Sequence, residues 1–204
     1  MEKRPKIISV SNQKGGVGKT TTTINLATAM VSFNKKILIV DLDPQGNAST
    51  GLGIDLKERD KNIYKVMTSQ TEVNDCVFDT IIPNLKIIPS TIDLSAVEIE
   101  FSSIPKRELV LKKSFENLTI DFDYVLIDCP PSLGLLTVNA MAASDEVIVP
   151  LQCEFYALEG LSQLLKTMEL IKGSLNTKLS LKGIVLTMFD TRNKLSTLVE
   201  KDVR

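Results

Sequence analysis

A short glycine-rich segment at residues 14–21, with the sequence KGGVGKTT, most constrains how this chain can fold. It follows an apolar run at residues 7–10 and precedes a helical pattern at residues 20–33. A strand that turns through glycines directly into a helix is the context of a phosphate-binding loop, which belongs to sheets with parallel strands. The segment therefore predicts both an anion site and an α/β fold.

The residue types in this segment match the chemistry of nucleotide binding. Glycines allow backbone conformations that other residues avoid, so successive N–H groups can point at phosphate oxygens. The start of a helix adds a partial positive charge. We expect Lys19 to reach the β- and γ-phosphates and the Thr20 hydroxyl to coordinate Mg²⁺. The predicted nucleotide-binding residues are Lys14, Gly15, Gly16, Val17, Gly18, Lys19, Thr20 and Thr21.

Strand-like and helical patterns alternate along the rest of the chain. The strand-like runs are short and rich in β-branched residues, and they lie at 7–10, 37–40, 85–88, 124–127, 146–150 and 183–189. Helical patterns lie at 20–33, 94–102, 106–118, 135–143 and 157–175, and another begins at residue 196. This alternation predicts one α/β domain over residues 1–204 with a mainly parallel, doubly wound sheet. Residues 55–83 are polar and poorly periodic, so we expect short helices and loops there.

Carboxylates follow two of the predicted strands. Asp41 and Asp43 come after the run at 37–40, and Asp128 comes after the run at 124–127. In open parallel sheets, ligands bind beyond the carboxyl ends of the strands. Asp128 has the form of a Walker B acid, which holds Mg²⁺, often through water. One acid of the first pair can orient the water that attacks the γ-phosphate, and the other can support the magnesium shell or the loop.

The composition excludes several classes of protein. With 204 residues, a formal net charge of -1 and 43% apolar residues, the chain can bury a sizeable core and has no overall polycation signature. The apolar run at 7–10 is too short for a signal peptide or a membrane span, so we expect a cytoplasmic protein. Cys76, Cys129 and Cys153 form no CxxC pair, and we expect buried, reduced thiols.

Positive charge gathers toward the end of the chain. Residues 166–204 contain eight basic and four acidic side chains, a local balance of +4. This count fits either an ordinary solvated surface or a patch that contacts nucleic-acid phosphates.

Six residues precede the first strand-like run, so we expect no N-terminal helix-turn-helix and no sequence-specific DNA reading.

The lysine at position 14, placed before the glycines, gives the loop the form of the deviant Walker A motif. Four further segments carry a resemblance to the ParA/Soj family of DNA-partitioning ATPases, and together they cover most of the chain in the family order. They are DLDPQGNASTGLG at 41–53, IDCPPSLGLLTVNA at 127–140, PLQCEFYALEGLSQLL at 150–165 and GIVLTMFDTR at 183–192. The resemblance implies a P-loop ATPase whose slow hydrolysis of ATP to ADP and phosphate serves as a molecular switch.

The resemblance also implies roles for individual residues. Lys14 would contact the nucleotide of a second subunit, so that ATP and Mg²⁺ join two copies into a homodimer. Asp43 would orient the attacking water, and Asp41 would support the magnesium shell or the loop. The catalytic residues expected on this basis are Asp43, Lys14 and Lys19, and the metal-binding residues are Thr20, Asp128 and Asp41.

Partners follow from the same resemblance. Arg192 occupies the position of a family arginine implicated in DNA contact, and Lys194 and Lys201 could lie near it. Non-specific DNA and a ParB-type centromere-binding protein would be the partners, and the protein would be associated with the nucleoid. Family members continue past the point that corresponds to Arg204, so the resemblance predicts a chain that lacks the usual C-terminal segment and part of the adenine pocket.

Two alternative functions share the loop. One is a MinD-like membrane-surface regulator of division-site placement, which would need an amphipathic C-terminal helix; no membrane anchor is visible in this sequence. The other is a metabolic ATP-dependent enzyme of the same fold, which would also bind a small organic substrate. Nitrogenase iron proteins would need cluster-ligating cysteines at a spacing that the three cysteines here do not have.

Overall fold

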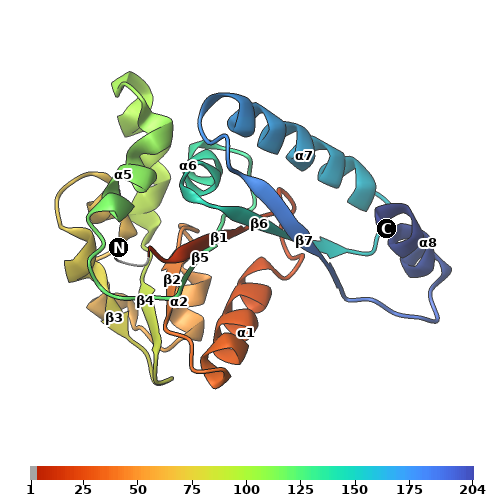
Figure 1. Ribbon diagram of the computed structural model, residues 1–204, viewed down its shortest axis with the longest axis horizontal. Helices are drawn as coiled ribbons and strands as arrows, with labels where there is room; N and C mark the ends of the chain where they lie inside the picture. The colour runs from red at the N-terminus through yellow and green to blue at the C-terminus, as the bar shows by residue number, and fades with distance from the viewer. Residues whose placement is uncertain (1–3) are drawn as a thin grey trace.

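A seven-stranded sheet runs through the computed structural model, which describes residues 4–204; residues 1–3, before the first strand, lie outside the described part (Figure 1). The strand order is β3-β4-β2-β5-β1-β6-β7, and only the β3–β4 pair is antiparallel among the described strands. The strands are β1 (Lys6–Val10), β2 (Ile37–Asp41), β3 (Phe78–Asp79), β4 (Leu85–Ile88), β5 (Tyr124–Asp128), β6 (Glu146–Gln152) and β7 (Ser180–Thr187). The predicted α/β class with a mainly parallel sheet is confirmed.

Helices cover both faces of this sheet. In Figure 1, α1 and α2 lie below it, and α5, α6 and α7 lie above it. The final helix follows the edge strand β7 and packs against α7. The helices are α1 (Lys19–Ser32), α2 (Asn47–Gly51), α3 (Ile63–Met67), α4 (Val97–Glu100), α5 (Val110–Glu116), α6 (Leu135–Ala143), α7 (Ala157–Ser174) and α8 (Lys194–Val203). Short 3₁₀ turns link several of them.

The core explains why β2 is apolar without interruption up to Asp41. Successive side chains of a strand point to opposite faces, and helices cover both faces here. In β2, Leu38 and Val40 pack into the core between the sheet and helices α5 and α6, whereas Ile37 and Ile39 pack into the core between the sheet and α1. All four side chains are fully buried. Burying each contributes on the order of 1.5 to 3 kcal/mol relative to exposure.

Most predicted elements lie where the sequence patterns place them, but some boundaries differ. The strand predicted at 183–189 runs instead over Ser180–Thr187, because Met188 adopts a left-handed conformation (φ 53) that ends it. The helix predicted at 94–102 is only one turn of α-helix, flanked by 3₁₀ turns. The two-residue strand β3 lies in the segment expected to hold only short helices and loops. All three cysteines are buried and free, as predicted.

The strand order brings the predicted functional segments together at the carboxyl ends of the central strands. Strand β5 lies between β1 and β2, and Asp128 at its end is level with Val10 on one side and Asp41 on the other. Since all three strands are parallel, the loops that follow them leave the sheet side by side. This is the point at which open α/β sheets bind ligands.

Candidate nucleotide site

The glycine-rich loop between β1 and α1 forms as the sequence predicts. Gly16 and Gly18 adopt left-handed conformations (φ 75 and 87) that residues with a Cβ atom avoid. Gly18 caps the 14-residue helix α1 without a side-chain hydrogen bond, so the first N–H groups of the helix are directed at the loop. Val17 is buried and its carbonyl accepts a hydrogen bond from the Thr187 hydroxyl at 2.9 Å, which ties the loop to β7.

Lys19 is held inside this loop. Its ammonium donates to the Lys14 carbonyl at 2.8 Å, and the residue is 7% exposed. Burial lowers the pKa of Lys19, while the nearby charges of Asp128 and Asp43 act in the opposite direction. A cation in this position can stabilise the negative charge of a phosphate bound in the loop.

Asp128 at the end of β5 is a fully buried carboxylate with one free oxygen. Its Oδ1 accepts a hydrogen bond from the Thr23 hydroxyl at 3.2 Å, whereas its Oδ2 has no partner among residues 4–204. Burial raises the pKa of Asp128 to about 7, and the hydroxyls of Thr20 and Thr23 oppose this shift. A buried carboxylate oxygen without a partner, next to a threonine hydroxyl, fits a Mg²⁺ ion, which accepts oxygen ligands and would favour the charged carboxylate.

Asp41 and Asp43 differ in how their carboxylates are used. Asp41 is fully buried, and its Oδ2 accepts hydrogen bonds from the Ser49 amide and hydroxyl at 2.8 and 2.7 Å. Its Oδ1 accepts the Asp43 amide at 3.3 Å, and burial raises the pKa of Asp41. Of the two roles considered for Asp41, these contacts favour support of the loop over a magnesium ligand.

Asp43 instead stands at the start of a turn that faces the phosphate loop. Its Oδ1 accepts the Gln45 amide at 2.9 Å, and its carbonyl accepts the Gly46 amide at 2.9 Å. Because Asp43 is close enough to shift the pKa of both Lys19 and Asp128, the three charged groups form one cluster. A carboxylate in such a place can accept a hydrogen bond from a water molecule beside a bound phosphate.

Lys14 lies at the rim of the loop and pairs with a residue that the sequence patterns did not single out. Its ammonium forms an ion pair with Glu154, which follows β6, and both side chains are partly exposed. The next two side chains, Phe155 and Tyr156, are 80% and 70% exposed and pack edge to face. The sequence held a signal for these residues, because an acidic and two aromatic residues follow closely after a buried strand. Such positions lie at the carboxyl ends of the strands, where open α/β sheets bind ligands.

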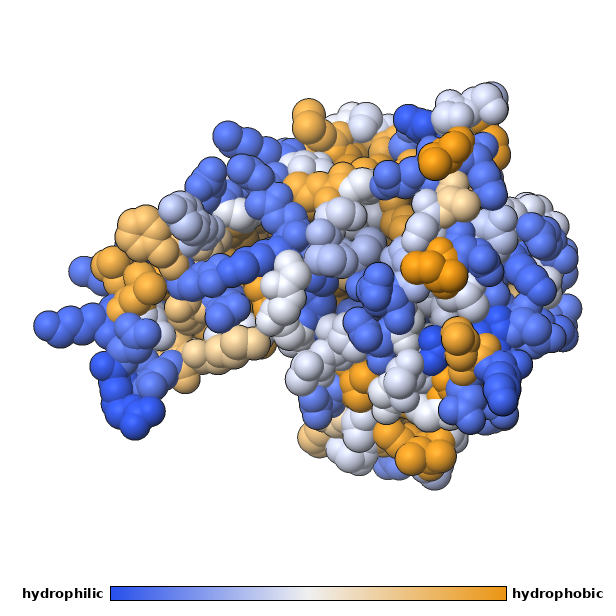
Figure 2. Space-filling view, turned by 180° about the vertical axis from the view of Figure 1, so that it is seen from behind, coloured by the Kyte–Doolittle hydropathy of each residue, from blue (hydrophilic) through white to orange (hydrophobic). Residues whose placement is uncertain are grey.

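Arg192 lies in the loop between β7 and α8. In Figure 1, α8 lies at the end of the molecule marked C. The Arg192 guanidinium contacts both carboxylate oxygens of Asp190, at 3.0 and 2.9 Å, and the Arg192 side chain is 89% exposed. Lys194 and Lys201 line the same shallow hollow of about 310 Å³, so the predicted neighbourhood of the three basic residues is confirmed. Figure 2 shows hydrophilic side chains gathered at this end of the molecule, at the left of that view, with hydrophobic ones beside them.

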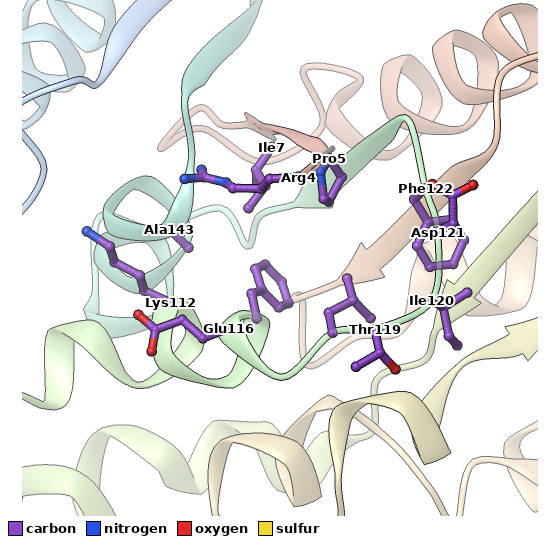
Figure 3. Close-up of a pocket in the computed structure, with 12 residues that line it drawn as sticks. Arg4, Pro5, Ile7, Lys112, Glu116, Thr119, Ile120, Asp121, Phe122 and Ala143 are labelled. Atoms are coloured by element: carbon purple, nitrogen blue, oxygen red, sulfur yellow. The ribbon is translucent and has the colours of Figure 1, made fainter. Parts of the chain in front are cut away.

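A separate pocket of about 620 Å³ lies at the amino ends of the central strands, where β1 and β5 begin (Figure 3). Phe122 and Ala143 give it apolar walls, while Arg4 and Lys112 stand at its rim. Arg4 is engaged by Asp145 at 2.8 Å. The phosphate loop follows the other end of β1, so this pocket is not part of the nucleotide site.

Comparison with known proteins shows the family of this chain. Residues 5–181 match the model of a family described as AAA domain. The chain is 52% identical to the chromosome partitioning protein ParA of Caulobacter vibrioides over 201 residues, which are 98% of this chain and 75% of that protein. The chain belongs to the ParA/Soj family of chromosome-partitioning ATPases.

Two further relatives show how far the likeness extends. The sporulation initiation inhibitor protein Soj of Bacillus subtilis is 49% identical over 199 residues, covering 98% of this chain and 79% of that protein. A crystal structure of cobyrinic acid a,c-diamide synthase from Mycobacterium smegmatis with bound ADP and magnesium superposes with a TM-score of 0.92 at 38% identity. That match covers 98% of this chain and 81% of the other. Among residues 4–204 of this ParA/Soj chain, no helix has the length and apolar character to cross a membrane.

Proposed function

We propose that this ParA/Soj chain is an ATP-dependent switch for DNA partitioning. ATP and Mg²⁺ join two subunits face to face, the dimer binds DNA without sequence preference, and hydrolysis releases it. The observation that carries the proposal is the phosphate loop with Asp43 and Asp128 on the neighbouring strand ends and Lys14 at its rim.

The nucleotide step rests on the charged cluster. The loop amides and Lys19 would bind the β- and γ-phosphates, and Thr20 and Asp128 would hold the magnesium ion. Asp41 braces the turn behind them. Magnesium would neutralise charge on the phosphates. Asp43 accepts a hydrogen bond from the attacking water and so orients it toward the γ-phosphorus. We propose that this hydrolysis is slow and so serves as a timer for the bound state.

Pairing of two subunits rests on Lys14. This lysine is free of the core, and its ion pair with Glu154 is partly exposed, so exchanging that partner for a phosphate of a second subunit costs about 1 kcal/mol or less. A cation supplied in trans to phosphates resembles an arginine finger. The exposed rings of Phe155 and Tyr156, next to this ion pair, would be covered when the subunits meet.

DNA contact is assigned to the basic end of the chain. Arg192, with Lys194 and Lys201 beside it, can bind phosphates, and such contacts carry no sequence information. Binding of this kind has a dissociation constant of roughly 10⁻⁴ to 10⁻⁶ M and weakens steeply with salt. Relatives named as chromosome partitioning proteins support this setting. The family resemblance adds a nucleoid location and a ParB-type protein as the partner that stimulates hydrolysis.

A DNA co-sedimentation series tests the proposal. Wild-type protein, Lys14→Ala and Asp43→Ala are each measured with ATP, with ADP and without nucleotide. We expect wild type to bind DNA with ATP alone, Lys14→Ala to bind in no state, and Asp43→Ala to remain bound in ATP because it does not hydrolyse. Equal DNA binding in every nucleotide state would contradict the proposed ATP-dependent switch.

A small-molecule ATP-dependent enzyme is the second candidate, because one structural neighbour is named as a synthase. The fold does not separate the two functions, since they share the loop and the sheet. The greater identity to partition proteins favours the switch. Nucleotide-independent DNA binding together with ATP consumption coupled to amidation of a small carboxylic acid would favour the synthase.

A further inference from the structure

Arg59 is a buried arginine that joins three segments near the nucleotide site. It is 5% exposed, and its five N–H donors make five hydrogen bonds. Nε and Nη2 donate to the Ile54 carbonyl at 3.1 and 2.7 Å, Nη1 donates to the Gly46 and Ser90 carbonyls at 3.3 Å each, and Nη2 also donates to the Thr50 hydroxyl at 2.8 Å. The guanidinium thus connects the turn after β2, the end of α2 and the end of β4.

The charge of Arg59 is compensated by backbone dipoles. None of the ion pairs found within residues 4–204 includes this arginine. A buried cation is costly to desolvate unless its donors are all paired. An apolar side chain could fill the same space at lower cost, so the carbonyls that Arg59 holds indicate what it contributes.

One of these carbonyls belongs to the turn that carries Asp43. Gly46 closes that turn by donating its amide to the Asp43 carbonyl at 2.9 Å, while its own carbonyl accepts from Arg59. Gly46 has a left-handed conformation (φ 64), and a Cβ atom there would collide with Nη1 of Arg59. The guanidinium therefore packs directly on the backbone of the turn.

A second link braces the same turn from the other side. Ser49 donates to Asp41 and accepts the Ser90 amide at 3.0 Å, so the end of β4 is tied to both the Asp41 carboxylate and the Arg59 guanidinium. The turn from Asp43 to Gly46 is held between these two links. A shift of about 1 Å in a reacting or positioning group can cost on the order of 10²-fold in rate.

We propose that Arg59 is a positioning residue for ATP hydrolysis: it fixes the Gly46 carbonyl and thereby aims the Asp43 carboxylate at the attacking water. This inference rests on the function proposed above for Asp43. Arg59 itself contacts neither nucleotide nor water. Its removal lowers the turnover number and leaves nucleotide affinity intact, because the phosphate loop and Lys19 are built on different segments.

The test compares Arg59→Lys and Arg59→Gln with wild type. The readouts are kcat for ATP hydrolysis and the Kd of a fluorescent ATP analogue with Mg²⁺. We expect kcat to fall on the order of 10- to 100-fold in Arg59→Gln, less in Arg59→Lys, and the Kd to stay within about twofold in both. If Arg59→Gln does not fold, Thr50→Val serves in its place, because it removes one acceptor of the guanidinium and is expected to lower kcat in the same direction.

A structural control and a double variant make the test specific. Asn139→Ala removes a buried side chain that bonds the backbone at Leu111, Arg107 and Leu135, so it lowers stability without touching the turn. We expect it to keep wild-type kcat. In an Asp43→Asn background, Arg59→Gln should cause no further loss of kcat, since the group it positions is already gone.

The outcomes separate this inference from the proposed function. Additive losses in the double variant, or a weaker Kd with unchanged kcat, would overturn the positioning role of Arg59 while Asp43 stands. Unchanged hydrolysis in Asp43→Asn would overturn both. DNA binding that ignores nucleotide would overturn the partition switch and leave the Arg59 result standing, because these assays contain no DNA.

Discussion

Two sets of charged groups in this molecule are held in different ways. One set is buried around the phosphate loop, and the other is exposed at the rim of the loop and near the end of the chain. Lys19, Asp43 and Asp128 are each less than one-tenth exposed, and every one has a partner in the backbone or a hydroxyl. Lys14 and Arg192 sit in exposed or partly exposed ion pairs formed with a single carboxylate. The first set is fixed before any ligand arrives, whereas the second can exchange partners at little cost.

This difference separates two kinds of task. Phosphoryl transfer needs dipoles and charges that do not reorganise, and burial together with hydrogen bonds to the backbone and to hydroxyls supplies them. Contacts with a second subunit or with DNA need groups that leave a weak local partner for a stronger charged one. We therefore expect substitutions in the buried set to change catalysis or stability by large factors. Substitution of Glu154 or Arg192 in the exposed ion pairs should change assembly by smaller factors.

Asp43→Asn gives the largest expected effect. Loss of the acceptor for the attacking water should lower kcat by about 10²- to 10⁴-fold, with nucleotide binding retained. Asp79→Asn on the edge strand β3, which changes an 83% exposed carboxylate, is the matched control. Steady-state phosphate release measures both, and a drop below tenfold for Asp43→Asn would place the catalytic group outside the buried set.

Asp128 gives a pH-dependent effect on the nucleotide-free protein. Its pKa is raised from 3.8 to about 7, so the folded state keeps a proton that the unfolded state has released between these values. This contribution to stability is present at low pH and is lost as pH rises toward 7, by up to about 1.4 kcal/mol per pH unit. Asp128→Asn removes the dependence.

Thermal denaturation of both proteins at several pH values measures this effect. The stability gained by Asp128→Asn over wild type should grow as pH rises from 5 to about 7 and then stay constant. A gain that is the same at every pH would mean that Lys19 keeps the carboxylate ionised, and the burial argument for this residue would be wrong.

Glu154→Gln probes the exposed set. Removing the carboxylate frees Lys14, so dimerisation with a non-hydrolysable ATP analogue should strengthen by a few-fold, in line with an ion pair worth roughly 0.2 to 1 kcal/mol. Glu159→Gln, an exposed acid in the first turn of α7, controls for the change in net charge. Analytical ultracentrifugation measures both, and dimerisation that weakens would show that Glu154 itself bridges the subunits.

Arg192→Ala has the smallest expected effect. Loss of one phosphate contact should weaken DNA binding a few-fold and lower the slope of log affinity against log salt by about 1. Lys86→Ala is the control, because Lys86 is also paired with an exposed carboxylate, Asp79, at the opposite edge of the sheet. An equal change in the control would assign the effect to net charge and remove Arg192 from the DNA surface.

Local patterns carried most of the fold and the phosphate loop. Strands buried on both faces are mostly apolar, and the helix over Leu135–Ala143, whose residues are mostly buried, is found at its predicted bounds. The helix predicted at 94–102 is shorter than its pattern, because 3₁₀ turns on both sides satisfy the same backbone groups. Glu154 and Arg59 were missed because their partners are 140 and up to 31 residues away.

The sequence by itself determined the parallel α/β sheet, the glycine loop that binds phosphate and the acids that follow β2 and β5. These follow from short-range rules of glycine conformation, strand periodicity and helix ends. Only the tertiary structure decided that Ser49 hydrogen-bonds the Asp41 carboxylate and that one oxygen of Asp128 has no hydrogen-bond partner among residues 4–204. It also decided that Arg59 hydrogen-bonds the turn that carries Asp43. The physical reason is that burial and hydrogen-bond partners depend on which strand ends the sheet order places side by side.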